Sequence, residues 1–248
     1  MLVFLKVFMS TNLPVLMIVT SHAHLGDTGK PTGIWAEELT TPYYALVDAG
    51  FDVVLASPLG GTPPFAAGSV KVAPEENEGS VKRFLADAQA MAKFNATHPT
   101  ASLHAADYSA VFLPGGHGTM WDTATDDATA RLVADAFNAG KPTAAVCHGP
   151  AGLIGALRPD GKSILWGKKV NGFTNEEETA AGLMDVVPFH LETRMRQLGA
   201  VFENGPMWQP YAVRDGNLIT GQNPQSSALV ASHVVTALLA GAGTHRSA

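Results

Sequence analysis

Cysteine, charged residues and basic clusters are scarce in this chain. Its 248 residues include a single cysteine, Cys147, and only 15% charged residues, with no concentration of lysine or arginine. One cysteine cannot form an intramolecular disulfide, which argues against a disulfide-stapled secreted domain. The net charge of -6, without a basic cluster, argues against binding to nucleic acid or to an anionic membrane.

Long hydrophobic segments and targeting signals are also missing. The apolar start MLVFLKVFM is too short to span a bilayer and lacks the basic region and cleavage site of a signal peptide. We therefore expect a cytoplasmic protein that does not enter membranes. Residues 1–13 are expected to be extended or poorly ordered, and both Met1 and Met9 are compatible with the start of the protein.

Hydrophobic residues make up 46% of the chain and occur in short runs that alternate with helical patterns. The runs predict buried strands at 15–20, 52–57, 110–116 and 142–147, and the patterns predict helices at 33–50, 127–140 and 227–241. This alternation predicts an α/β fold with a doubly wound, mostly parallel sheet. In such a fold the functional site lies beyond the carboxyl ends of the strands.

We expect a single domain over residues 1–248, because no repeat or change in composition marks a boundary. Residues 58–105 are interpreted as an insertion, with an exposed Pro/Gly-rich excursion at 58–79 and a helix over 80–95. Within 212–221, Asp215-Gly216 predicts the turn of a β-hairpin.

Cys147 lies in TAAVCHGPAGLIG, where a strand pattern is followed at once by a Gly-Pro helix start. A side chain at such a strand–turn–helix junction faces the crevice. The helix start is expected to lower the thiol pKa and, with the small Gly149, to offer N–H groups for an oxyanion. The adjacent His148 could be an acid or base, or could contribute only its backbone N–H. The alternative is a structural cysteine at the end of a buried strand.

A second candidate segment is LPGGHGTMWD, which follows the predicted strand at 110–116. The Gly115-Gly116 pair lets the backbone approach a ligand and could supply a second oxyanion donor. His117 follows the pair and is a candidate for substrate binding. The alternative is a simple tight turn.

Acidic residues occur in two places that could face the same crevice. Of Glu37 and Glu38, one could lie against the thiol with its carboxyl protonated by burial, although surface acids are the alternative. Of Glu176, Glu177 and Glu178, one could orient a catalytic histidine, although acids are also common at an exposed helix start. The residues themselves do not select among the three.

His22, His24 and Asp27 are close together in the sequence but lack a matching ligand at zinc-like spacing. We therefore expect neither a metal nor an organic cofactor.

Taken together, AVCHGPAGL and the preceding FLPGGHGTMWD resemble the ThiJ/PfpI superfamily. TGIWAEELTTPYYALVDAGFDVVLASP, GKKVNGFTNEEE and NLITGQNPQSS extend the resemblance over nearly the whole chain. The resemblance implies a flavodoxin-like sheet of the class I glutamine amidotransferase-like type. The chain length and the last two motifs are similar to the branch that contains glyoxalase III (D-lactate dehydratase) and heat-shock chaperones.

The resemblance also assigns residues. It implies that Cys147 is the nucleophile, that His148 is its neighbour in catalysis, and that the acid four residues before Pro42, Glu38, contacts the thiol. The third acid, six residues after the glycine of GFT, is Glu178. A homodimer is implied as well. No His-x-Glu occurs near the C-terminus, which argues against glutamine hydrolysis.

The expected function is therefore a cofactor-free conversion of methylglyoxal, or a related 2-oxoaldehyde, to the 2-hydroxy acid through a hemithioacetal on Cys147. A cysteine peptidase, amidase or deglycase using the same site is one alternative. A holdase chaperone or a redox or stress sensor is another.

Overall fold

The computed structural model describes residues 13–77 and 79–244. The expectation for residues 1–13 therefore falls, apart from Leu13, outside the described residues. The strands are β1 (Val15–Ile18), β2 (Val53–Ser57), β3 (His98–Pro99), β4 (Ala110–Leu113), β5 (Thr143–Val146), β6 (Lys169–Val170), β7 (Val201–Phe202), β8 (Ala212–Asp215) and β9 (Leu218–Gly221). The α-helices are α1 (Ala36–Asp48), α2 (Gly79–Ala86), α3 (Ala88–Asn95), α4 (Asp127–Asn138), α5 (Asn175–Ala180), α6 (Leu191–Gln197) and α7 (Ser227–Thr244). Short 3₁₀ helices are η1 (Pro74–Glu76), η2 (Thr100–Ser102), η3 (Ala105–Asp107), η4 (His117–Met120), η5 (Gly149–Leu153) and η6 (Pro224–Ser226).

The main sheet has seven strands in the order β3-β2-β1-β4-β5-β9-β8. All neighbouring pairs are parallel except β8 and β9, which form the antiparallel hairpin. The predicted α/β fold with a mostly parallel sheet is confirmed. The strand order changes direction between β1 and β4, so the loops after these strands diverge and leave a crevice at the carboxyl edge.

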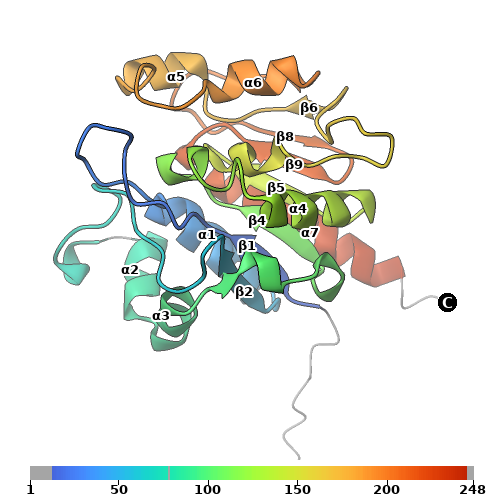
Figure 1. Cartoon of the computed structure of the whole chain (residues 1–248). Helices are drawn as coiled ribbons and strands as arrows, with labels where there is room; N and C mark the ends of the chain where they lie inside the picture. The colour runs from blue at the N-terminus through green and yellow to red at the C-terminus, as the bar shows by residue number, and fades with distance from the viewer. Residues whose placement is uncertain (1–12, 78, 245–248) are drawn as a thin grey trace, which may run out of the picture.

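Alternate residues of the central strands enter two separate cores, as the two-residue period of a strand requires. On β1, Val15 and Met17 pack with α1 and α7, whereas Leu16 and Ile18 pack on the face that α4 covers. Helices thus cover both faces of the sheet (Figure 1). None of the described helices has the length and apolar character needed to cross a membrane.

The segment 58–105 contributes to this core. Two helices, α2 and α3, replace the single helix expected over 80–95, because the Asp87 side chain accepts hydrogen bonds from the first-turn N–H groups of α3 and starts a new helix. Phe84 on α2 and Phe94 on α3 are buried in the same core as α1. The short β3 then extends the sheet beyond β2.

Residues 169–202 form a small layer that the strand and helix patterns did not predict. The two-residue strands β6 and β7 pair with each other, and α5 and α6 lie with them beyond the β8 edge (Figure 1). This layer places α5, which contains the run of three glutamates, beside the crevice.

Candidate active site

Cys147 occupies a tight turn directly after β5. Its φ of 58° is in the left-handed region, which a residue with a side chain rarely adopts. The turn is held on both sides, because the Cys147 N–H donates to Gly221 O at 2.9 Å and the Cys147 carbonyl accepts from Phe173 N–H at 2.8 Å. The backbone therefore presents the thiol at the carboxyl edge of the sheet, where it lines a cavity although only 3% of the residue is exposed.

The expectation that a helix start lowers the thiol pKa is wrong. The segment after the turn is a five-residue 3₁₀ helix rather than an α-helix, so few aligned peptide dipoles face the sulfur. Burial raises the pKa of the Cys147 thiol well above its usual range, and an ionised Glu38 raises it further. Only the backbone N–H of His148, which is hydrogen-bonded to the sulfur, lowers it. The resting group is a thiol that needs a base.

His148 is placed to be that base. Its Nδ1 lies 3.4 Å from Cys147 Sγ, and its Nε2 lies 2.7 Å from Glu178 Oε2. Burial, followed by the neighbouring His117, lowers the pKa of His148 to about 4, against the opposing effect of Glu178. The ring is therefore neutral at neutral pH. With its Nε2–H donated to the carboxylate, the lone pair of Nδ1 is free to accept the thiol proton.

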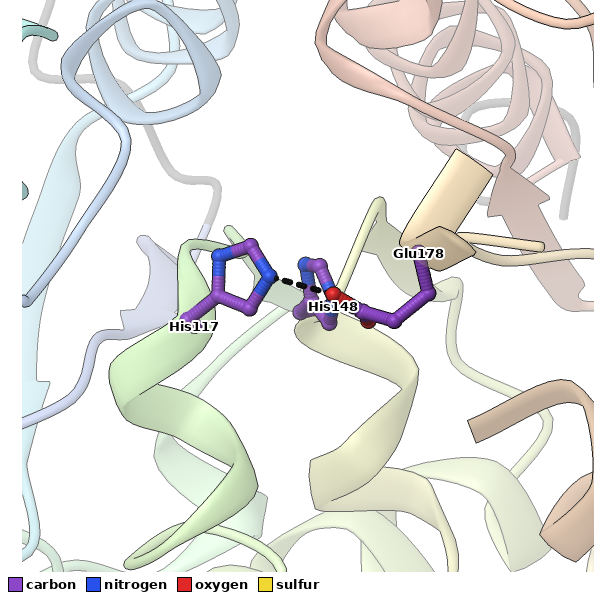
Figure 2. A group of neighbouring side chains, drawn as sticks. All are labelled: His117, His148 and Glu178. Carbon is purple, nitrogen blue, oxygen red and sulfur yellow. Dashed lines mark hydrogen bonds and ion pairs between the residues drawn. The ribbon is translucent and has the colours of Figure 1, made fainter. Parts of the chain in front are cut away.

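Glu178 joins two histidines rather than one (Figure 2). Its Oε1 accepts from His117 Nε2 at 2.8 Å, while its Oε2 accepts from His148. The two rings lie with centroids 4.0 Å apart. Burial on its own would raise the pKa of Glu178, but its charge and hydrogen-bond interactions with the histidines hold it well below its usual range. Glu178 is thus a carboxylate that fixes the orientation and tautomer of His148, the arrangement of a catalytic triad.

The structure separates the three consecutive glutamates. Glu176 is exposed, whereas Glu177 and Glu178 are buried on the inner face of α5. Glu177 caps its own helix together with Thr174 and also accepts hydrogen bonds from Trp208 N–H, Gln222 Nε2 and Asn223 Nδ2. It faces away from the histidines and holds the wall of the cavity instead.

Glu38 approaches the thiol from α1 and is fully buried, whereas its neighbour Glu37 is exposed. Its Oε2 accepts the Gly115 N–H at 2.8 Å, which leaves Oε1 as the oxygen that can hold a proton. Burial raises the pKa of Glu38 to about 8, although its hydrogen bonds with Cys147 and Gly115 lower it. A neutral carboxylic acid thus stands beside Cys147 at neutral pH.

The glycines play different parts from those expected. The Gly115 N–H is occupied by Glu38, so it positions this acid and is not available to an oxyanion. Gly149 packs against the backbone of Leu113 and is not on the cavity wall. Gly116 lines the cavity, and its N–H has no partner among the described residues. The Gly116 amide is therefore a backbone donor that remains available to a substrate oxygen.

The cavity that contains these groups has a volume of about 400 Å³. Most of its wall is apolar, with Leu25, Trp35, Phe173, Leu183, Trp208 and Pro224 among its members. Among the described residues, Glu37, Glu38 and the two histidines are its titratable groups beside Cys147, and none of the lining residues is a lysine or arginine. No sequence pattern predicts the aromatic wall, because Trp35, Phe173 and Trp208 lie in three separate parts of the chain.

One cluster in the described part of the chain has the ligand types of a metal site. His117, His148 and Glu178 offer one atom each, all within 4.8 Å of one another. In this structure the two Nε2 atoms are hydrogen-bonded to the carboxylate, so a metal ion would have to displace both bonds. His22 instead bonds its Nε2 to the His24 carbonyl and stacks on Trp121.

This chain is similar to known proteins in both sequence and fold. The model of the DJ-1/PfpI family matches residues 32–237. Glyoxalase 3 from Candida albicans is 29% identical over 235 residues, which cover 90% of this chain and 97% of the relative. Glutathione-independent glyoxalase HSP31 from Saccharomyces cerevisiae is 27% identical over 240 residues, which cover 90% and 97%. The crystal structure of glyoxalase III from Candida albicans superposes with a TM-score of 0.82 at 28% identity and covers 91% of this chain and 97% of that one. The chain belongs to the DJ-1/PfpI family.

Proposed function

We propose that the protein is a glutathione-independent glyoxalase that converts methylglyoxal, or a related 2-oxoaldehyde, to the 2-hydroxy acid, with Cys147 as the nucleophile. The observation that carries the proposal is the position of the thiol between a neutral base, His148, and a neutral acid, Glu38. Isomerisation of an aldehyde to an acid needs a nucleophile and groups that both give and take protons. The printed names of the relatives point to the same activity.

The cavity also fits catalysis without glutathione. A glutathione adduct carries carboxylates, and these need cationic partners in a buried site. No lysine or arginine of residues 13–77 and 79–244 lies on the cavity wall, and the acids of the wall, Glu37 and Glu38, disfavour an anionic ligand. A small neutral aldehyde has no charge to bury and so does not need a cationic partner.

In the first step the thiol proton passes to His148 Nδ1 as the sulfur adds to the aldehyde carbon. The carbonyl electron pair moves to oxygen, which takes the proton of Glu38. The product is a hemithioacetal, and the enzyme now holds an imidazolium and a Glu38 carboxylate. Glu178 stabilises the imidazolium through its short hydrogen bond to Nε2.

In the second step the Glu38 carboxylate removes the proton from the former aldehyde carbon. The electron pair forms the carbon–carbon double bond, and the ketone oxygen takes the proton of His148 to give an enediol. The Gly116 N–H is available to this oxygen while it carries charge. Glu38 then returns its proton to the neighbouring carbon, and the hydroxyl on the first carbon loses its proton to His148, which leaves a thioester.

Water completes the cycle. Glu38 takes a proton from the water that attacks the thioester, and Cys147 leaves with the proton of His148. The 2-hydroxy acid is released, and all three side chains regain the protonation states in which they started. Because Glu38 exchanges a proton at every stage, a carboxyl with a pKa of about 8 suits this role at neutral pH.

The test is lactate formation from methylglyoxal without glutathione, in the wild type and in Cys147→Ala. We expect turnover by the wild type and none above background by the variant. Glu178→Gln should reduce kcat by about 10²–10⁴-fold because it removes the carboxylate that fixes His148, and Glu176→Gln on the exposed face of the same helix is the matched control. No turnover by the wild type, or equal turnover by Cys147→Ala, would contradict the proposal.

A cysteine hydrolase acting on amides is the second candidate, because the Cys147–His148–Glu178 chain is also the arrangement of an acyl-transfer triad. Such a hydrolase does not need the neutral Glu38 beside the thiol. A panel of amide and peptide substrates separates the two: cleavage that depends on Cys147 but persists in Glu38→Gln would favour the hydrolase.

A further inference from the structure

The cavity is much larger than methylglyoxal. Its volume of about 400 Å³ falls within the range of pockets that enclose drug-sized ligands, about 300–1,000 Å³. A buried apolar cavity of about 150 Å³ is already enough to hold benzene. Methylglyoxal bound at Cys147 would therefore leave most of the space to water, and this water would lie against apolar walls.

The wall next to the nucleophile is aromatic. The Phe173 ring lies against His148 with centroids 4.4 Å apart, and Trp208 lies against Phe173 with centroids 5.6 Å apart. Trp35 adds a further aromatic surface. Offset and tilted ring pairs at these separations are favourable, so the series His148–Phe173–Trp208 can be continued by a ring of the substrate.

Trp208 is held in place by an unusual backbone. Its φ is 60°, and apart from Cys147 no other non-glycine residue in the described ranges has a positive φ. The buried carboxylate of Glu177 accepts the Trp208 N–H at 2.9 Å and so stabilises this conformation. Backbone strain that is maintained at a cavity wall indicates that the position of the side chain matters for the ligand.

The charged groups on the cavity wall restrict the class of substrate further. In the described part of the chain, no lysine or arginine lines the cavity to pair with a phosphate or carboxylate, whereas Glu37 does line it. Glu37 and Glu38 on the wall disfavour a negatively charged group in the cavity. The largely apolar wall favours an uncharged group beyond the reacting carbons over a charged one.

We infer that the preferred substrates are 2-oxoaldehydes that carry an uncharged aromatic or similarly bulky apolar group, with the dicarbonyl at Cys147 and the apolar group against Phe173 and Trp208. This inference rests on the proposed glyoxalase function and specifies its substrate class.

The experiment compares kcat/KM for phenylglyoxal, measured as mandelate formed, with kcat/KM for methylglyoxal, measured as lactate formed, both without glutathione. We expect the value for phenylglyoxal to be at least about tenfold higher, the size of effect that burial of additional apolar atoms produces. A third substrate, 4-carboxyphenylglyoxal, has the same ring with a negative charge, and its kcat/KM should be below that of phenylglyoxal.

Two variants test whether the preference for phenylglyoxal depends on Trp208. Trp208→Ala should lower the ratio of kcat/KM for phenylglyoxal to that for methylglyoxal, because it removes the aromatic wall. Trp166→Ala is the control, since Trp166 is a half-exposed tryptophan away from the cavity and should leave the ratio unchanged.

Turnover of methylglyoxal with an equal or lower kcat/KM for phenylglyoxal would overturn this inference and leave the proposed function standing. A phenylglyoxal preference that Trp208→Ala does not reduce would also overturn it. Turnover of neither aldehyde would overturn the proposed function, and this inference with it.

Discussion

Cys147 is surrounded by groups that are neutral at rest although each can ionise. Burial raises the pKa of Glu38 and lowers that of His148, so both shifts disfavour charge around the thiol. The negative charge in this part of the molecule lies on the two buried acids of α5: Glu178, which two histidines stabilise, and Glu177, which accepts hydrogen bonds from Trp208 and from the chain after β9. These surroundings disfavour a thiolate at Cys147 in the resting protein.

Glu38 should make stability depend on pH. Its pKa in the folded protein, about 8, lies above its ordinary value of 4.5, so between these limits the folded state holds a proton that the unfolded state loses. The Glu38 contribution is complete below about pH 4.5 and is lost as pH rises towards 8. We expect the unfolding free energy of the wild type minus that of Glu38→Gln to fall over this range in urea titrations. A difference that rises or stays constant would show that Glu38 is ionised in the folded protein.

His117 should set the acid limb of the activity profile. It lowers the pKa of His148 and forms a hydrogen bond to Glu178, yet it does not contact the thiol. In His117→Gln the pKa of His148 should rise from about 4 towards its ordinary value, because one of the two causes of its depression is removed. The acid limb of kcat/KM against pH should therefore move to higher pH. If His117 only supported the fold, kcat/KM would fall equally at every pH and the limb would stay in place.

At the level of elements, α5 connects the triad to the cavity wall. Adjacent residues on this short helix face different partners, with Glu178 on the histidines and Glu177 on the segment around Trp208 and on the chain after β9. A change in one of these acids should therefore affect a different property from a change in the other.

Glu177→Gln should mainly destabilise the cavity wall. The buried carboxylate accepts hydrogen bonds from Thr174, Trp208, Gln222 and Asn223, and an amide cannot accept all of them. We expect the unfolding free energy to fall by about 2–4 kcal/mol and the amide of Trp208 to exchange faster with solvent. Urea unfolding and hydrogen exchange measure the two effects. Glu176→Gln is the control, and an equal effect in both variants would contradict this role for Glu177.

The sequence was sufficient to predict the central strands, because each is a continuous apolar run buried on both faces. It was also sufficient to predict the turn at Cys147. The assignment of Glu178 came from a family resemblance, since the chemistry of three consecutive acids does not distinguish them. Only the short α5 separates them, by turning Glu176 to solvent. The segment after Cys147 is a five-residue 3₁₀ helix, in which Gly149 and Gly152 pack closely against Leu113 of β4.

The sequence patterns also could not predict contacts between residues that are far apart in the chain. The hydrogen bond between Gly115 and Glu38 joins residues far apart in the chain and changes the role expected of the glycine. The shared carboxylate of His117 and His148 depends on the adjacency of β4 and β5 in the sheet. In the aromatic wall, Phe173 belongs to the layer formed by residues 169–202, and Trp208 is hydrogen-bonded to Glu177 of that layer. The two-residue strands of the layer are too short to give a periodic signal.

At the scale of the whole molecule, residues of the segment 58–105 and residues of the sheet belong to the same hydrophobic core. Phe84 of α2 is fully buried among residues of α1 and the sheet, so the segment should not unfold separately. Phe84→Ala should lower the unfolding free energy of the whole chain by about 3–5 kcal/mol. Circular dichroism and tryptophan fluorescence should report the same transition.

The control for this prediction lies in the same segment. Val72 is fully exposed, and Val72→Ala should change the unfolding free energy by no more than about 0.5 kcal/mol. Two separate transitions in Phe84→Ala would instead show that the segment is an independent folding unit.

The sole cysteine of the chain is also the group that the fold holds at the end of β5. A reagent that modifies a thiol of this protein therefore modifies Cys147, with no background from other sulfhydryls. A chromogenic disulfide should therefore label the buried Cys147 slowly in folded molecules and rapidly in unfolded ones. The slow phase then counts the folded molecules in a preparation, and rates can be expressed per folded molecule, which additional surface cysteines would not allow.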